Sequence, residues 1–353
     1  MTAELIPLDA LLRDHGLGDT AEEPFENDGW SGATLTRLRR GGGQRFILKR
    51  DSLARDWIAR ATNDGPVLRE AWFAAHGPAL PPGIRAGSLG AGLDEVTGEV
   101  GILMPDLTDV LFDWDAPISV PQLEQVLSAL AEMHGFPWRT SGEIGDGPWC
   151  PLRERVTLIC RPSLERAGPV HDAVAERLLP GWDAWDRLAT PAARRVVAAL
   201  AADPQPLLDE LASQPATLIH GDLKLANVGI EADGTVVLVD WQMVSVAPIA
   251  VEVGWSLVAN VASLPLPPDE VIARYRSKLS YAISDAEDDG RWIGGSELDD
   301  DGVDAAILVG LLLRGWRKGM DAEAGITLAS GVSAADDLAW WCESAVAAAD
   351  RLF

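Results

Sequence analysis

The hydrophobic positions of this chain change their spacing partway along it. Two short apolar runs, at 44–49 and 99–104, are bounded by glycine and polar residues, which is typical of strands. A later segment that opens at Ser119 and ends at Gly135 has apolar residues at helical spacing. Further helices are predicted at 66–77, 171–188, 191–202, 205–213, 250–262, 268–283, 303–318 and 334–352. The pattern predicts an α+β protein with a strand-rich first part and a mainly helical remainder.

Composition places the chain among globular proteins. Its 353 residues, 47% of them hydrophobic, are enough for two lobes with buried cores. No apolar run is long enough to cross a bilayer, and no basic segment precedes an apolar one at the N-terminus. The three cysteines, Cys150, Cys160 and Cys342, are too few and too scattered for a disulfide framework or a zinc site. We therefore expect a cytoplasmic protein without a membrane partner.

The charge is strongly acidic but does not select a substrate. A formal net charge of -25 argues against nucleic acid as a partner and is compatible with a cationic acceptor. The densest acidic segments, 284–290 and 297–301, are interpreted either as solvated loops or as the lining of an acceptor site. The basic segment 314–318 binds an anionic acceptor or caps a helix end. These two signals conflict.

Tryptophan is unusually frequent, with 14 residues against two tyrosines. Indole rings in the second part of the chain stack on a sugar, attract a cation or belong to the core. The tryptophans in question are Trp138, Trp149, Trp241, Trp255 and Trp316. The sequence leaves this choice open.

The chemistry of the chain is concentrated in residues 219–242. Asp222 is followed five residues later by Asn227, and Asp240 ends an apolar strand, which is the arrangement that phosphoryl transfer from a nucleotide requires. In this interpretation Asp222 accepts the proton of an acceptor hydroxyl, while Asn227 and Asp240 hold Mg²⁺. Lys224 offsets the charge of the transferring phosphoryl group or is a solvated lysine. His220 is expected to order the backbone of the loop rather than to titrate.

Two segments resemble the aminoglycoside phosphotransferase and choline kinase-like families. They are His220-Gly221-Asp222-Leu223-Lys224 through Asn227, and Asp240-Trp241-Gln242. The resemblance implies a bilobal protein-kinase-like fold, with a small antiparallel β-sheet lobe that carries one key helix and a larger helical lobe. Gly221 replaces the usual arginine of protein kinases, and Trp241-Gln242 replaces Phe-Gly, which favours small-molecule kinases. Glu252 stands where these families usually have an aspartate that braces the catalytic loop.

The resemblance also implies nucleotide-binding residues in the first part of the chain. Ser31 and Gly32 lie in a small-residue turn, 27–35, that is expected to cover the phosphates. Lys49 ends an apolar strand, as does the lysine that contacts the α- and β-phosphates in this fold. Glu70, on the predicted helix 66–77, is its expected ion-pair partner.

Residues 105–109 are the expected hinge between an N-terminal lobe, 1–104, and a C-terminal lobe, 110–353. Adenine needs one backbone carbonyl and one N–H from an extended segment, and Pro105 offers only its carbonyl. We expect Pro105 to accept from adenine, Leu107 to donate, and Met104 to shape the back of the pocket.

The leading interpretation is a kinase that moves the γ-phosphate of ATP, or alternatively GTP, with Mg²⁺ to a hydroxyl of a small molecule. The acceptor would be an aminoglycoside, an aminosugar or an amino alcohol. One alternative is a protein kinase, which the short interval between Asp240 and the next helix disfavours. The other is an inactive nucleotide-binding module, which the presence of Lys49, Asp222, Asn227 and Asp240 together disfavours.

Overall fold

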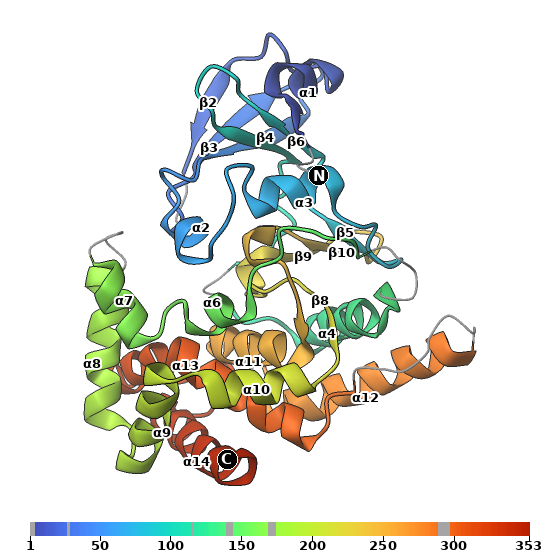
Figure 1. The fold of residues 1–353 in the computed structure, drawn as a ribbon. Coiled ribbons are helices and arrows are strands. Elements are labelled where there is room, and N and C mark those ends of the chain that lie inside the picture. The colour runs from blue at the N-terminus through green and yellow to red at the C-terminus, as the bar shows by residue number, and fades with distance from the viewer. Residues whose placement is uncertain (1–3, 27–28, 114–115, 139–143, 169–173, 289–296) are drawn as a thin grey trace.

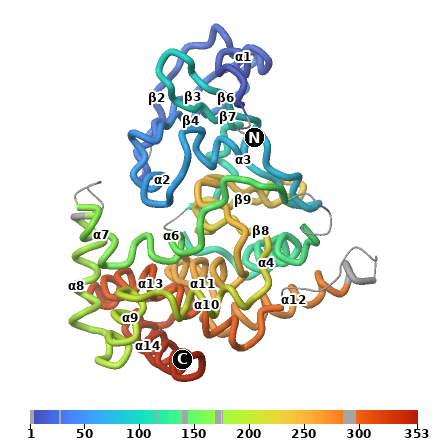
Figure 2. The backbone as a smooth tube through the Cα atoms, in the orientation of Figure 1, coloured from blue at the N-terminus to red at the C-terminus, as the bar shows by residue number. Residues whose placement is uncertain are grey.

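The computed structural model describes residues 4–26, 29–113, 116–138, 144–168, 174–288 and 297–353. It forms a smaller lobe built on a β-sheet and a larger, mainly helical lobe (Figure 1). The colour in Figure 2 runs from blue in the smaller lobe to red in the larger lobe, where the C-terminus lies. The predicted α+β architecture is confirmed.

The smaller lobe has a six-stranded sheet of order β1-β6-β7-β4-β3-β2. All neighbours are antiparallel except the short edge pair β1 and β6, which is parallel. The strands are β1 Ile6–Pro7, β2 Glu22–Phe25, β3 Thr34–Arg39, β4 Arg45–Asp51, β6 Gly90–Leu93 and β7 Val100–Pro105. β4 and β7 form the centre of the sheet. Both contain consecutive apolar residues because these positions are buried.

Three short helices accompany this sheet. They are α1 Leu8–Asp14, α2 Trp57–Ala61 and α3 Arg69–His76. α3 packs against β6 and β7. It begins later than the predicted 66–77, because Leu68 has φ 53° and Asp64 accepts a hydrogen bond from the Arg69 N–H at 2.8 Å.

Two small sheets lie at the junction of the lobes. β5 Ile84–Ala86 pairs in parallel with β10 Val236–Leu238, which is antiparallel to β9 Val228–Ile230. β8 Ala216–Ile219 pairs with β11 Ser245–Pro248. The segment before the hinge is thereby hydrogen-bonded to the strand that leads into Asp240, which the sequence did not predict.

The larger lobe has its helices close to the predicted positions, with two more, within 152–167, that the sequence did not predict. The helices are α4 Val120–Gly135, α6 Leu152–Thr157, α7 Arg161–Ala167, the π-helix Val174–Leu178, α8 Leu179–Leu188, α9 Pro191–Ala202, α10 Gln205–Ser213, α11 Ile249–Asn260, α12 Pro268–Asp288, α13 Asp300–Glu323 and α14 Ala334–Leu352. Of the predicted helix at 171–188, residues 171–173 lie outside the described part.

α13 is the central helix of the larger lobe and packs against α8, α11 and α14. Its contact with α11 requires glycine, since a Cβ at Gly254 would lie 2.1 Å from the Ala306 carbonyl oxygen. The helix is kinked at Arg314, where φ is -132° and ψ is 21°.

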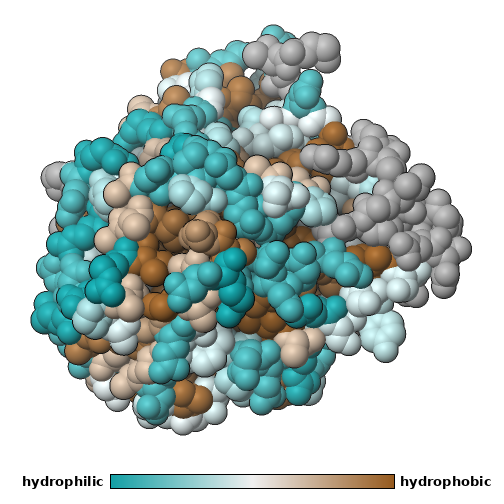
Figure 3. Space-filling view, turned by 60° about the horizontal axis from the view of Figure 1, so that its bottom comes forward, coloured by the Kyte–Doolittle hydropathy of each residue, from teal (hydrophilic) through white to brown (hydrophobic). Residues whose placement is uncertain are grey.

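One face of the molecule shows how polar and hydrophobic residues are distributed. The face shown in Figure 3 is mainly hydrophilic, with hydrophobic residues in patches between polar ones. No helix in the described part of the chain is both long and apolar enough to cross a membrane.

Candidate active site

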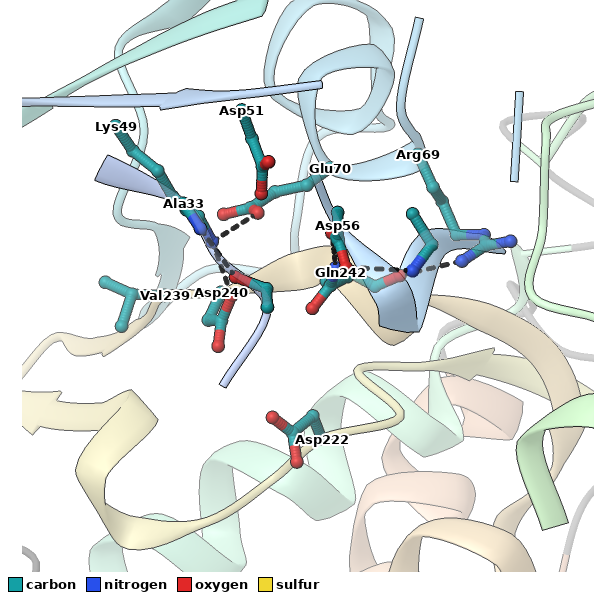
Figure 4. Close-up of polar contacts among 12 residues, drawn as sticks. Ala33, Lys49, Asp51, Asp56, Arg69, Glu70, Asp222, Val239, Asp240 and Gln242 are labelled. Atoms are coloured by element: carbon teal, nitrogen blue, oxygen red, sulfur yellow. Dashed lines mark hydrogen bonds and ion pairs between the residues drawn. The ribbon is translucent and has the colours of Figure 1, made fainter. Parts of the chain in front are cut away.

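Lys49, Glu70 and Asp240 come from three distant elements and meet at one point. Lys49 lies in β4, Glu70 in the first turn of α3, and Asp240 directly after β10. The Lys49 Nζ lies 2.6 Å from the Glu70 Oε2 and 2.7 Å from the Asp240 Oδ1 (Figure 4). The predicted lysine–glutamate ion pair is therefore formed, and Lys49 links it to the strand end of the larger lobe.

Lys49 and Asp240 stabilise each other's charges, whereas burial raises the pKa of Glu70 to about 7 despite the charge of Lys49. Burial would lower the pKa of Lys49, but Asp240 and Glu70 outweigh it and raise that pKa above its usual value. Burial would raise the pKa of Asp240, but Lys49 and Lys224 hold it well below its usual range. Lys49 is thus a fixed cation and Asp240 a fixed anion at neutral pH.

Asp222 lies in the loop after β8, on the larger lobe (Figure 4). Its Oδ2 accepts hydrogen bonds from the Lys224 Nζ at 3.1 Å and from the Asn227 Nδ2 at 3.2 Å. The Lys224 Nζ is also 3.9 Å from the Asp240 Oδ2. Burial would lower the pKa of Lys224, but Asp222 and Asp240 outweigh it and raise that pKa. A cation therefore lies between the two aspartates.

His220 orders this loop through both ring nitrogens. The Nδ1 accepts from the Asp222 N–H at 3.2 Å, and the Nε2 donates to the Val239 carbonyl at 2.9 Å. The ring is fully buried and lies 4.5 Å from the Trp241 ring, centroid to centroid. These contacts leave Nδ1 as the acceptor and Nε2 as the donor of the ring. The side chain connects the loop of Asp222 to the strand end of Asp240.

Glu252 braces the same loop despite its extra methylene group. Lying in the first turn of α11, it accepts from the His220 N–H at 2.6 Å and from the Gly221 N–H at 2.8 Å. Burial would raise the pKa of Glu252, but the hydrogen bond and charge of His134 and the backbone hydrogen bond from His220 hold it below its usual value. The bracing role that the resemblance left in doubt is therefore met geometrically by glutamate.

Gly221 is required by the close packing of β8 and β11. Its φ is +80°, and a Cβ at this position would lie 2.0 Å from the Met243 carbonyl oxygen. No side chain fits there, which gives a physical reason for glycine where protein kinases have arginine.

Gly221→Ala is expected to lower the free energy of unfolding by about 3 kcal/mol, because left-handed strain adds to a backbone clash. Urea denaturation measures the change. Gly234→Ala is the matched control, since Gly234 has φ +92° but its Cβ would meet no atom closer than 3.4 Å. Equal destabilisation by both variants would contradict the clash as the cause.

The turn with Ser31 and Gly32 is placed over the junction between the lobes. The Ser31 Oγ accepts from the Ala33 N–H at 3.3 Å, and the Trp30 carbonyl accepts from the Trp57 Nε1 at 2.7 Å. Trp30 also contacts Trp316 of the larger lobe, with ring centroids 6.3 Å apart. Residues 27–28 of the predicted turn lie outside the described part.

Met104 and Pro105 are the last two residues of β7, and Leu107 follows the strand. Met104 lines a small cavity together with Glu70, Asp240 and Trp241. Pro105 is paired with Phe46 of β4. Leu107 is buried, and its carbonyl accepts from the N–H groups of the next turn. The cavity thus adjoins the Lys49 ion pair.

A polar network that the sequence analysis missed joins the lobes behind Lys49 (Figure 4). Gln242 donates to Asp56, whose Oδ1 also caps α2 by accepting from the N–H groups of Ile58 and Ala59. The buried Arg69 donates to the Gln242 carbonyl at 2.8 Å and to the Pro148 carbonyl at 2.6 Å. The only local signal was Asp56 as a helix N-cap. The network fastens α2 and α3 to the segment after Asp240.

Asp56 is expected to make folding less favourable as the pH rises. Burial and Asp51 raise its pKa from 3.8 to about 7, so the folded state binds more protons than the unfolded state within that window. Asp56→Asn keeps the capping oxygen and should gain stability relative to the wild type between about pH 4 and pH 7.

Urea denaturation at about pH 5 and about pH 8 measures this difference. Asp9→Asn is a control of opposite sign, because the hydrogen bond from Arg13 lowers the pKa of Asp9. A stability difference for Asp56→Asn that does not depend on pH would contradict the assignment.

The donor set fits a divalent cation held together with a nucleotide. Asn227 directs its amide nitrogen at the Asp222 carbonyl, 2.9 Å away, and at the Asp222 Oδ2, which leaves its amide oxygen as a ligand. Asp240 supplies a carboxylate. Among the described residues, no group of three or more His, Cys, Asp and Glu side chains is arranged to hold a metal alone. One carboxylate, one amide oxygen and phosphate oxygens match the preference of Mg²⁺.

One family model matches most of the chain. The model of the phosphotransferase enzyme family matches residues 26–286. Similar solved structures include the choline kinase LicA from Streptococcus pneumoniae (10% identity, 96% of this chain and 98% of that chain covered, TM-score 0.47). Another is the macrolide 2'-phosphotransferase MphH from Brachybacterium faecium (17% identity, 97% and 96% covered, TM-score 0.39).

A third is the amicoumacin kinase hAmiN, solved with AMP-PNP, Ca²⁺ and Ami (14% identity, 98% and 93% covered, TM-score 0.46). A sequence comparison with curated proteins gives no match. The family match spans the turn, the Lys49 strand, the hinge and both aspartate segments. The chain belongs to the phosphotransferase enzyme family.

Proposed function

We propose that the protein transfers the γ-phosphate of ATP to a hydroxyl group of a small molecule. The observation that carries this proposal is the position of Lys224 between Asp222 and Asp240, 3.1 Å and 3.9 Å from their nearest carboxylate oxygens. A phosphoryl group placed there has a proton acceptor on one side, a metal-binding carboxylate on the other, and a cation beside it. Positioning and charge stabilisation of this kind supply most of the catalysis of phosphoryl transfer.

Each residue has one task in the proposed reaction. The acceptor oxygen attacks the γ-phosphorus while the bond to the β–γ bridging oxygen breaks, and ADP leaves with that electron pair. Asp222 takes the hydroxyl proton on its carboxylate, and Lys224 offsets charge on the transferring group. Lys49, held by Glu70, binds the α- and β-phosphates. Asp240 and Asn227 would hold Mg²⁺, which supplies charge neutralisation when bound.

The adenine would be bound by the hinge. The Pro105 carbonyl and the Leu107 N–H are the proposed partners of the base, and Met104 forms the back wall. Ser31 and Gly32 would cover the phosphates from the smaller lobe. GTP is the alternative donor, and a comparison of ATP with GTP as substrate tests the choice.

The connection after Asp240 favours a small acceptor over a peptide. A 3₁₀ helix, Trp241–Met243, is followed directly by β11, which pairs with β8, and then by α11. This segment is occupied by hydrogen bonds of the sheet and offers no extended platform for a peptide. A protein kinase is therefore the weaker candidate.

The test combines nucleotide binding with an acceptor screen. Calorimetry with ATP and Mg²⁺ should show binding to one site, and ADP release should depend on a small hydroxylated acceptor. Failure to bind Mg·ATP would contradict the proposal. So would ADP release that no acceptor in the screen increases.

A further inference from the structure

Besides nitrogens of His134, Arg194 and Trp341, four buried N–H donors in the described part of the larger lobe lack hydrogen-bond partners and belong to neighbouring residues. They are the Arg155 Nη2, the Arg314 Nε, the Trp255 Nε1 and the Trp316 Nε1. Their residues are only 2%, 4%, 8% and 1% exposed, respectively. A buried donor without a partner is costly and rare, so a concentration of four at one place requires an explanation.

These donors belong to one cluster, which we call the Arg–Trp cluster: Arg155, Trp255, Arg314 and Trp316. The Arg155 Cζ lies 4.6 Å from the centroid of the Trp255 ring, and the Arg314 Cζ lies 5.2 Å from it. The Arg314 Cζ is also 5.1 Å from the Trp316 ring. The residues come from α6, α11 and the kink of α13. Three helices thus contribute to a single buried group of cationic and aromatic side chains.

The cluster adjoins the proposed catalytic aspartate. The Arg155 Nε donates to the Gly221 carbonyl at 2.6 Å, one residue before Asp222. Burial and the neighbouring Arg317 lower the pKa of Arg314 to about 10, while the charges of Asp222 and Asp321 oppose that shift. Arg314 remains protonated at neutral pH. The Asp222 carboxylate therefore lies within electrostatic range of both cluster arginines.

The two cluster arginines differ from neighbouring basic residues in having no carboxylate partner among the described residues. Within the basic segment 314–318, Lys318 pairs with Asp337 at 2.8 Å, and Arg317 pairs with Asp321 at 2.7 Å. Asp222, the nearest acid of the loop, already pairs with Lys224. A buried guanidinium without a counter-ion is unfavourable, so an external anion would complete the cluster.

The tryptophans likewise fall into those whose indole N–H has a hydrogen-bond partner and those whose N–H has none among the described residues. The indole N–H groups of three of them donate to backbone carbonyls: Trp138 to Met133, Trp149 to Gly145 and Trp241 to Leu238. Trp255 and Trp316 are the two of the five singled out in the sequence whose N–H groups stay unpaired. Trp30 of the phosphate-covering turn contacts Trp316, so the donor side of the active site meets the cluster.

We infer that the Arg–Trp cluster binds the acceptor, and that the acceptor is a hydroxylated small molecule that carries an anionic group, a carboxylate or a phosphate. This inference rests on the proposed phosphoryl transfer. The cluster offers hydrogen-bond donors and positive charge, which pair with anionic oxygens and repel an ammonium group. The indole rings supply apolar faces for the carbon skeleton. An anionic acceptor would place its hydroxyl beside Asp222.

The acidic segments do not oppose this assignment. Asp299 caps α13 through the Gly302 N–H at 2.8 Å, and Asp300 pairs with Arg276 at 2.9 Å. These described members of the segment 297–301 are thus engaged at the start of α13. The net charge of -25 belongs to the chain as a whole, whereas the charge at the cluster is positive.

The test uses acceptors that share a sugar ring and differ in charge: glucuronate and glucose 6-phosphate, neutral glucose, and cationic glucosamine. Binding is followed by tryptophan fluorescence in the presence of Mg²⁺ and a non-hydrolysable ATP analogue, and transfer is followed by product mass. We expect at least one anion to bind at least about tenfold more tightly than glucose and glucosamine. The better of the two anions distinguishes a carboxylate site from a phosphate site.

Arg314→Met should raise the dissociation constant of the preferred anion by at least about tenfold and leave that of glucose within about twofold. Trp316→Phe removes one unpaired N–H with little change of shape and should have a smaller effect in the same direction. Arg187→Met, an exposed arginine paired with Glu323 on the same lobe, is the matched control and should leave anion binding unchanged.

Each remaining outcome separates the two proposals. The inference that the acceptor is anionic would be overturned if glucosamine bound more tightly than each anion. It would also be overturned if neither anion bound at millimolar concentration. Equal loss of anion and glucose binding in Arg314→Met would overturn it as well. If the wild-type protein did not bind Mg·ATP, the proposed phosphoryl transfer itself would be contradicted.

Discussion

Asp222→Ala is expected to lower the turnover number about 10³-fold while the affinity for Mg·ATP stays within about twofold. The variant loses the carboxylate that takes the hydroxyl proton and aligns the acceptor oxygen. It also leaves Lys224 beside Asp240 without its second carboxylate partner. The nucleotide contacts proposed for Lys49 and the hinge are untouched. Steady-state kinetics and calorimetry on the same preparation separate the two effects.

Asp209→Ala, an exposed aspartate of α10, is the control for loss of one negative charge on the same lobe. Its turnover should equal that of the wild type. Turnover of Asp222→Ala at the wild-type level would remove the proposed base from the mechanism. A parallel loss of nucleotide affinity would instead show that Asp222 acts through the fold of the loop.

Lys49→Met is expected to lower kcat/KM for ATP about 10²–10³-fold. The variant loses a cation that contacts the phosphates. It also leaves the Glu70 and Asp240 carboxylates, both within 2.7 Å of the Lys49 Nζ in the native protein, without the charge between them. Their repulsion and burial would raise the pKa of Asp240, which weakens its hold on a divalent cation.

Kinetics at varied ATP and Mg²⁺ concentrations measure this change. Glu70→Gln should have a smaller effect, about tenfold, because Lys49 keeps its contact with Asp240. Lys278→Met, which removes a lysine of α12 that pairs with Glu124 of α4, is the control. Unchanged kinetics in Lys49→Met would contradict the phosphate-binding role.

Local signals in the sequence were sufficient for helices with strong ends. α4 begins after Ser119, which forms a capping box with Gln122, and α9 begins after Thr190 with a proline in its first turn. Their observed bounds agree with the predicted ones because caps and apolar spacing coincide. α3 begins later than predicted because the Leu68 backbone is left-handed, a feature that the proline at 66 does not reveal.

Non-local pairing was beyond the sequence. The parallel pair of β5 and β10 joins residues 84–86 to residues 236–238, which are far apart in the chain. β5 is also only three residues long. The very short β1 and α1 are stabilised by contacts with β6 rather than by local propensity. Such elements form because of tertiary packing, which leaves little trace in the local pattern.

In the candidate site, too, some residues could be predicted from local signals and others could not. Lys49, Glu70 and Asp240 could be predicted because each has a recognisable place at a strand end or in a helix. Arg155 and Arg69 could not, because neither lies in a motif. Each acts on backbone far away in the chain, Arg155 on the Gly221 carbonyl and Arg69 on the Gln242 carbonyl. The sequence indicated a basic segment at 314–318. Only the structure shows that Arg317 and Lys318 have carboxylate partners and that Arg314 has none among the described residues.

The most direct test of phosphoryl transfer to a hydroxyl is to follow the label of ATP into the acceptor. Wild-type protein is incubated with Mg²⁺ and ATP labelled at the γ- or the α-phosphate, together with the acceptor that increases ADP release most. The proposed mechanism predicts that label from the γ-phosphate alone appears in the acceptor as a phosphate ester, and that Asp222→Ala abolishes it. Transfer of the α-label, or no label in any acceptor while ATP is consumed, would contradict the mechanism.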